Sequence, residues 1–188
     1  MIQENPLLGP EWAALAEAIV LVIEKTGKNS TFCITTYGKR YGLSPDSSPY
    51  FQGVRDEFGE LFIEASANLM CDPPLTDEEF EMLEFLSWDK PALTPDEYRN
   101  HDHRSESSNQ PNFERRFPDS VSPIDIAEFM MQTMVIVYGL TEEDFFNFGG
   151  RETSDKVEAL GKLGRLPSNP GNPDRQIFAM PGRHLDML

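Results

Sequence analysis

Three histidines and two cysteines are the side chains of this chain best suited to nucleophilic or metal chemistry. His101 and His103 stand close together in a polar stretch, and His184 lies near the end of the sequence. A metal site needs ligands that a helix or strand holds in place, and a nucleophile needs a base within hydrogen-bond reach. Because no strongly patterned segment carries these histidines, we expect them to be solvated and to form neither a metal site nor a catalytic site.

The cysteines and the acidic runs also lack a catalytic pattern. Cys33 and Cys71 lie far apart and belong to no Cys-x-x-Cys motif, so we expect two idle thiols and no disulfide in a reducing compartment. Helix capping explains the acidic run at residues 77–81 better than carboxylate catalysis does. The sequence also contains no phosphate-binding loop, no dinucleotide glycine fingerprint and no His-Glu-x-x-His motif. We therefore expect a non-enzyme that uses no cofactor.

The hydrophobic spacing defines the elements that would have to position a site. An apolar stripe over residues 10–25 predicts a helix, and a β-branched, aromatic run over residues 31–37 predicts a strand. Residues 50–55 and 60–68 are expected to form a hairpin, with Gly59 in its turn because glycine adopts a positive φ without strain. These segments predict a helix followed by three antiparallel strands.

The middle of the chain combines a helix start, a long polar stretch and an alternating segment. Thr76 and Glu79 form a capping box, so a helix is expected to begin at Asp77. Residues 89–110 are polar with few apolar anchors, and we expect them to form a long mobile loop. Residues 112–117 alternate between apolar and charged side chains, which predicts a short strand at the edge of the sheet.

The last strong helix starts at the Ser-Pro pair of residues 122–123 and ends at Gly139. Apolar side chains surround this helix, which predicts burial either in the core of the domain or against a second copy of the chain. Residues 141–144 are expected to cap one further helical turn, which carries the phenylalanines of residues 145–148. The Gly-Gly pair at 149–150 is expected to break the chain there.

Together these elements predict an α+β fold of order α-β-β-β-α-β-α. An antiparallel sheet of about four strands would be packed by helices in a domain over residues 1–150. Residues 151–188 are rich in proline and glycine and are expected to form a C-terminal extension.

The formal charge of −16 limits the classes of partner. Residues 151–188 hold six Lys/Arg and five Asp/Glu, a net +1, so residues 1–150 carry −17. Such a field repels phosphate backbones and anionic lipid, so we expect a protein partner with a basic surface and neither nucleic acid nor membrane. We expect a cytoplasmic location, because the first residues lack the basic-then-apolar order of a secretory signal.

Four short motifs follow one another in a definite order through the middle of the chain. They comprise a strand start, a strand end, a helix end and a second strand start, and their residues are Tyr50, Gln52, Glu64, Asn68, Leu86, Trp88, Pro111, Asn112 and Phe113. In order and spacing they resemble the TY-Chap group of actinobacterial proteins, which is named for its likeness to type III secretion chaperones and YbjN-like proteins. Two departures occur. Ser87 stands where glycine is usual, and Ala67 separates a serine and an asparagine that are usually adjacent.

This resemblance implies a type III secretion chaperone-like or YbjN-like fold and a non-catalytic, protein-binding role. The chain would act as a chaperone or adaptor for a secreted or toxin-type protein. An immunity protein that inhibits a cognate toxin is the first alternative, and a sensory or regulatory YbjN-like protein is the second. The sequence leaves these three functions open.

Three groups of residues are expected to contact partners. The first lies on the strand at residues 50–55, the second on the apolar helix, which could form a homodimer, and the third in the C-terminal extension, where prolines surround an apolar segment. The residues are Tyr50, Gln52, Met131, Val135, Ile177, Phe178 and Met180. The extension is expected to dock in extended form on the sheet of its own chain or of a sister subunit.

Overall fold

A computed structural model describes residues 12–37, 40–41, 48–67, 71–91, 112–150, 164–165 and 177–179. The elements are α1 (Ala13–Lys25), β1 (Ser30–Tyr37), β2 (Tyr50–Arg55), β3 (Leu61–Ala65), α2 (Asp77–Phe85), β4 (Phe113–Phe117), α4 (Pro123–Ile136), β5 (Phe145–Gly150), β6 (Gly164–Arg165) and β7 (Ile177–Ala179). The α+β fold expected from the sequence is therefore confirmed.

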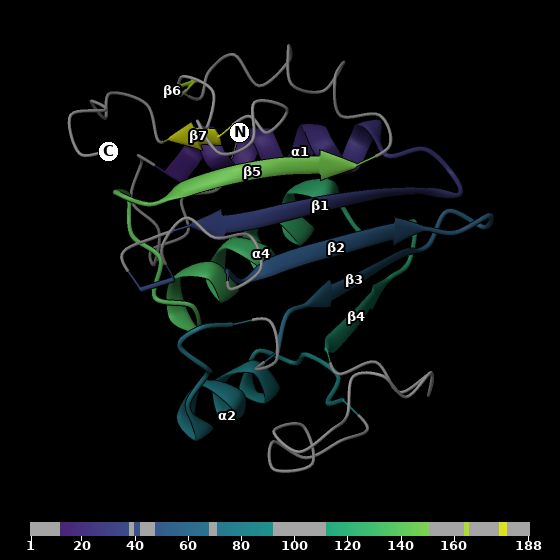
Figure 1. Cartoon of the computed structure of the whole chain (residues 1–188). Helices are drawn as coiled ribbons and strands as arrows, with labels where there is room; N and C mark the ends of the chain where they lie inside the picture. The colour runs from purple at the N-terminus through teal and green to yellow at the C-terminus, as the bar shows by residue number, and fades with distance from the viewer. Residues whose placement is uncertain are drawn as a thin grey trace, which may run out of the picture.

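The strands form one antiparallel sheet in the order β4-β3-β2-β1-β5-β7-β6. Helices α1 and α4 pack against each other on one face of this sheet, and α2 lies beyond the β4 edge (Figure 1). Within the described ranges, no helix covers the opposite face. We call this opposite, helix-free side the outer face.

The core lies between the sheet and the helices α1 and α4. Alternate residues of β1 and β2 point to this side, because successive side chains of a strand face opposite ways. Phe32, Ile34 and Phe51 are almost fully buried there. The ring of Phe32 lies over Gly53, where a Cβ atom would stand 2.1 Å from the ring. This close approach explains why a residue without a side chain occupies the centre of β2.

Several local predictions are confirmed. The capping box forms at the start of α2, where Thr76 accepts from the Glu79 amide and Glu79 accepts from the Thr76 amide. Gly59 has a φ of 99° in the β2–β3 turn. Ser122 is the N-cap of α4, although its side chain makes no capping hydrogen bond. Strand β4 lies at the sheet edge, as its alternation predicted.

The prediction of a further helical turn after α4 is wrong. The phenylalanines of this segment belong to β5, which pairs with β1 and β7, so the sheet is larger than the expected four strands. Thr141 and Asp144 do bond to each other, but their bonds close a turn that precedes a strand. Phe146 and Phe148 are both buried and face the same side, which is the period of a strand. Gly149 continues this strand and does not break it.

Part of the C-terminal extension joins the same sheet. Strand β7 pairs with β5 on one side and with β6 on the other. The backbone at Ile177 and Phe178 is therefore extended and paired with the chain's own sheet, in the form expected from the sequence. Met180 and residues 92–110 of the long loop expected at 89–110 lie outside the described residues.

Candidate functional site

The outer face carries an in-register row of polar side chains across four strands. Cys33 of β1 pairs with Gln52 of β2, Gln52 pairs with Glu64 of β3, and Glu64 pairs with Glu114 of β4. Gln52 is exposed, Glu114 is half-buried and Glu64 is 9% exposed. The row therefore places an exposed amide, a buried carboxyl and a half-buried carboxyl side by side on the face that no described helix covers.

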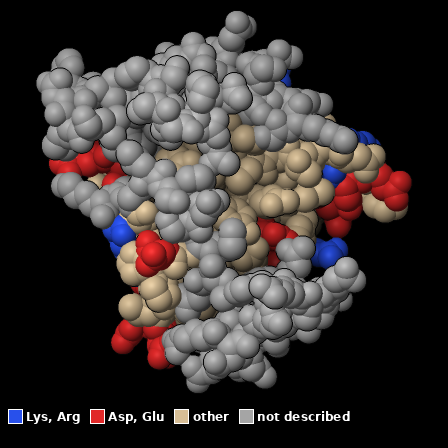
Figure 2. All heavy atoms as spheres, in the orientation of Figure 1, with Lys and Arg blue, Asp and Glu red and all other residues tan. Residues whose placement is uncertain are grey.

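A second row lies one step closer to the β2–β3 turn. Val54 pairs with Phe62, and Phe62 pairs with Arg116 on β4. The guanidinium carbon of Arg116 stands 5.5 Å from the centroid of the Phe62 ring, within cation–π range. Figure 2 looks onto the outer face, where uncharged surface crosses the middle and acidic side chains gather over the β2–β3 turn at the right. The face thus combines apolar side chains with acidic ones and with the exposed Arg116.

Tyr50, Glu64 and Asn112 form a hydrogen-bonded cluster at the end of β2 away from the turn. The Asn112 amide nitrogen donates to the Tyr50 hydroxyl at 2.9 Å and to a Glu64 carboxylate oxygen at 3.4 Å. The Asn112 side-chain oxygen accepts from the Ala67 amide at 3.2 Å. One buried asparagine therefore links three strands, and its side chain orders the Tyr50 end of the outer face.

Burial and the neighbouring Glu114 and Asn112 all act on the Glu64 carboxyl. Burial raises the pKa of this carboxyl, the hydrogen bond from Asn112 opposes that rise, and the facing Glu114 adds to it. Burial also raises the pKa of Tyr50, so its phenol stays protonated at neutral pH. A cation placed between Glu64 and Glu114 would relieve the repulsion between their carboxylates.

The structure brings together only some of the residues predicted to contact partners. Tyr50 and Gln52 share the outer face with Glu64. Met131 is 1% exposed in the single chain, which favours the core over a second copy for this residue, and Val135 is half-buried beside it on α4. The homodimer itself stays a prediction. Ile177 lies at a different part of the sheet, on β7 beyond β5.

The motif residues at the end of α2 are structural. Trp88 is buried, donates from its indole nitrogen to the Thr133 hydroxyl at 2.9 Å, and packs against Phe129 with ring centroids 4.8 Å apart. Ser87 has a φ of 69°. This left-handed conformation is one that glycine adopts without strain, and glycine is the usual residue at this position in the group that the motifs resemble.

Burial makes the Cys71 thiol unreactive. Neither Cys33 nor Cys71 forms a disulfide in the described part of the chain. Burial raises the pKa of Cys71 to about 11, so the sulfur is protonated and a poor nucleophile at neutral pH. No cluster of three or more potential metal ligands occurs in the described segments, and all three histidines lie outside them.

A hollow of about 510 Å³ lies beside the start of α1 and the α4–β5 turn. Its walls include Trp12, Arg40, Tyr41 and Asp144. The Arg40 guanidinium is paired with Glu79, and the Asp144 carboxylate accepts from the Thr141 amide at 2.6 Å. Within the described part of the chain, the buried Tyr41 hydroxyl has no hydrogen-bond partner. Because its charged groups are already engaged, this hollow offers a ligand less than the outer face does.

Sequence reasoning missed Glu114 and Arg116 as outer-face residues. The alternation within residues 112–117 contained the signal, because Phe113 and Phe117 on one face place Glu114 and Arg116 on the other. What local pattern could not supply was the pairing of β4 with β3, which brings Glu114 opposite Glu64.

Comparisons with known proteins identify no relative of this chain. No protein-family model, no curated protein and no solved structure matches the chain.

Proposed function

We propose that this chain is a non-catalytic protein-binding module, a chaperone or adaptor for a secreted or toxin-type protein with a basic surface. The observation that carries the proposal is the row of Gln52, Glu64 and Glu114 on the outer face. A lysine or arginine of the partner would neutralise the two facing carboxylates, and Gln52 would hydrogen-bond beside it.

Charge distribution supports this class of partner. The −17 carried by residues 1–150 would steer a basic protein toward the molecule and would repel nucleic acid. None of the described helices is long and apolar enough to cross a bilayer.

We also infer that the fold is of the type III secretion chaperone-like or YbjN-like kind and that the chain belongs with the TY-Chap group. The order α1-β1-β2-β3-α2-β4-α4 supports this inference, as does the left-handed backbone at Ser87 where glycine is usual. The clustering of Tyr50, Glu64 and Asn112 supports it further, because three separate motif pieces meet at one place.

The experiment is capture followed by quantitative binding. The purified protein is immobilised, exposed to extract of its native host, and the captured protein is identified, produced and titrated at about 50 and 300 mM NaCl. We expect a basic protein whose affinity falls at least about tenfold between these salt concentrations. Affinity that salt leaves unchanged, or tight duplex DNA binding at physiological salt, would contradict the proposal.

The identity of the captured protein separates the three functions. A chaperone or adaptor would hold an unfolded or signal segment of a secreted protein. An immunity protein would instead cover the catalytic cleft of a folded toxin and abolish its activity in a one-to-one complex. A regulatory protein would bind a partner that is neither exported nor toxic.

A further inference from the structure

The turn between β2 and β3 holds a phenylalanine in solvent. Phe58 is 77% exposed, although every other phenylalanine of the β2–β3 hairpin, Phe51 and Phe62, is buried or half-buried. Single exposed apolar side chains are common on protein surfaces, so the structure of the turn and the charges around it must carry any functional argument for Phe58.

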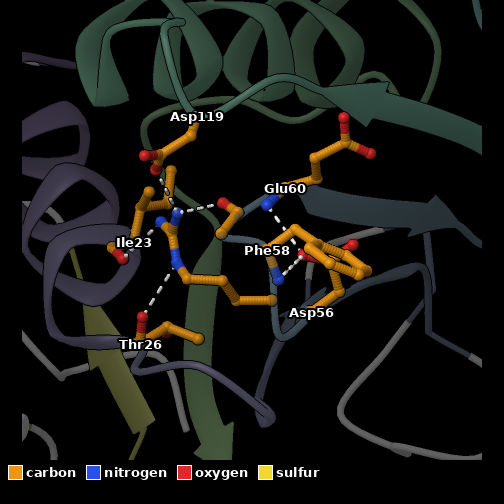
Figure 3. A network of polar contacts seen from close by, with 8 residues as sticks. Ile23, Thr26, Asp56, Phe58, Glu60 and Asp119 are labelled. Carbon is orange, nitrogen blue, oxygen red and sulfur yellow. Dashed lines mark hydrogen bonds and ion pairs between the residues drawn. The ribbon is translucent and has the colours of Figure 1, made fainter.

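Hydrogen bonds from one aspartate shape this turn. An Asp56 carboxylate oxygen accepts from the amides of Phe58 and Glu60, both at 2.9 Å (Figure 3). The Asp56 amide donates to the Glu60 carbonyl at 3.0 Å, and the Gly59 amide donates to the Asp56 carbonyl at 3.3 Å. Four bonds therefore define the backbone on both sides of Phe58.

Arg55 fastens the turn to the end of α1. Its guanidinium donates to the Thr26 carbonyl at 2.9 Å and to the Ile23 carbonyl at 3.2 Å, two carbonyls at the helix end (Figure 3). It also donates to the Gly59 carbonyl at 2.8 Å. The turn is thus tied to the body of the domain, so little conformational entropy would be lost when its ring is bound.

Acidic residues flank Phe58 in the sequence, and another lies beside the turn. Asp56, Glu57 and Glu60 belong to the same turn, and Asp119 lies beside it, 3.5 Å from an Arg55 nitrogen. Figure 2 shows acidic side chains gathered over this turn. The turn therefore presents the exposed Phe58 ring among acidic residues.

We propose that Phe58 is the anchor of a second contact surface, inserting into an apolar pocket rimmed by lysine and arginine on the protein partner. The proposal rests on the proposed function, since it concerns the same basic partner. Charge complementarity favours a partner pocket with a basic rim. The acidic turn would repel a pocket with an acidic rim, and it would also repel a bilayer surface that carries anionic lipid.

Phe85 provides the matched comparison. This residue is 80% exposed at the end of α2, so it is as accessible as Phe58. A Phe→Ser change at either position removes one exposed phenyl ring. Phe85 stands on a helix end and not in a turn held by an aspartate. General stickiness of exposed rings would therefore affect both positions equally, whereas a specific anchor affects Phe58 alone.

The test places a photo-crosslinking phenylalanine analogue at position 58 or at position 85 of the full chain in its native host. We expect a protein crosslinked from position 58 and not from position 85, at residues that line an apolar pocket with lysine or arginine at its rim. Equal crosslinking from both positions, or a crosslinked surface without basic residues, would overturn the proposal. An absence of any crosslink from position 58 would overturn it as well.

The crosslinked protein, produced separately, then serves as the titration probe. Phe58→Ser should weaken its binding about 10- to 100-fold, as loss of a central aromatic anchor does, and Phe85→Ser by less than about 3-fold. Asp56→Ala should also weaken binding by loosening the turn, and Asp56→Asn, which keeps the acceptor oxygen, should restore it. If Phe58→Ser leaves the affinity unchanged, Phe58 does not anchor the partner.

The anchor and the proposed function fail in different ways. If Glu114→Lys on the outer face weakens binding and Phe58→Ser does not, the protein-binding function stands and the anchor falls. If Phe58→Ser weakens binding and Glu114→Lys does not, the anchor stands and the outer face is not the binding surface.

Discussion

At one end of the β2–β3 hairpin, the buried Asn112 donates hydrogen bonds to the half-buried Tyr50 and the buried Glu64. At the other end, Asp56 bonds to the backbone of the turn and Phe58 is left in solvent. In the first region polar side chains satisfy each other, so substitutions there should change folding stability. In the second they hold a shape that presents one exposed ring, so replacing the ring should change binding and leave stability alone.

The largest expected effect breaks the covered end. Asn112→Ala removes the acceptor of the buried Ala67 amide and the amide donor of Glu64 and Tyr50, so the free energy of unfolding should fall by roughly 2–3 kcal/mol. Urea denaturation monitored by tryptophan fluorescence measures it. Gln52→Ala, an exposed change on the same face, should stay within about 0.5 kcal/mol. If Asn112→Ala lowers the free energy of unfolding no more than Gln52→Ala does, the cluster is dispensable for stability.

The next effect concerns the fastening of the turn to α1. Arg55→Ala leaves the Ile23 and Thr26 carbonyls without their guanidinium donor, and we expect a loss of about 1–2 kcal/mol in the same denaturation experiment. Asp119→Asn removes only the ion pair with a largely exposed carboxylate and should cost less than about 0.5 kcal/mol. Equal losses for both variants would mean that the ion pair, and not the carbonyl contacts, holds the turn.

The β2–β3 turn and the chain after α2 use different residues to reach a positive φ. The turn uses Gly59 at 99°, whereas the chain after α2 uses Ser87 at 69°. Ser87→Gly should therefore stabilise the protein by about 0.5–1 kcal/mol, with the strain relieved exceeding the entropy that glycine loses on folding. Asn29→Gly is the control, since Asn29 has a φ of 58° but asparagine tolerates this region, and its gain should be smaller. A destabilised Ser87→Gly would contradict the strain.

The smallest effect is a pH dependence at Glu64. Because burial raises its pKa in the folded state, the stability this carboxyl contributes is present below its unfolded pKa and is lost as pH rises through the folded pKa. Glu64→Gln keeps an acceptor for Asn112 and should be more stable than the wild type at pH 7 by roughly 0.2–1 kcal/mol. The difference should close as the pH falls toward 4. A difference between Glu64→Gln and the wild type that stays constant over this pH range would contradict the burial argument.

The sequence predicted those parts of the fold that depend on neighbouring residues. The Thr76–Glu79 capping box, the glycine turn at Gly59 and the alternation of β4 are all set by residues a few positions apart. The turn at residues 141–144 shows the limit, because the bonds between Thr141 and Asp144 suit a helix start and a strand start equally. Only the pairing of β5 with β1 decides between them.

The candidate site was predictable in part for the same reason. Tyr50 and Gln52 were expected to contact a partner, and they do share the outer face. Their association with Asn112 depends on β4 pairing with β3, a contact between residues far apart in the sequence that no local pattern encodes. No local pattern signals the exposure of Phe58, because most phenylalanines are buried and the exposure depends on the turn that Asp56 holds.

The most direct test of the binding face compares two charge reversals in a titration of the captured partner. Glu114→Lys lies on the outer face and Glu24→Lys lies exposed on α1, and both change the net charge by the same amount. We predict that Glu114→Lys weakens binding at least about tenfold and that Glu24→Lys weakens it by less than about threefold. Equal weakening by the two variants, or none from Glu114→Lys, would contradict the claim that the outer face binds the basic partner.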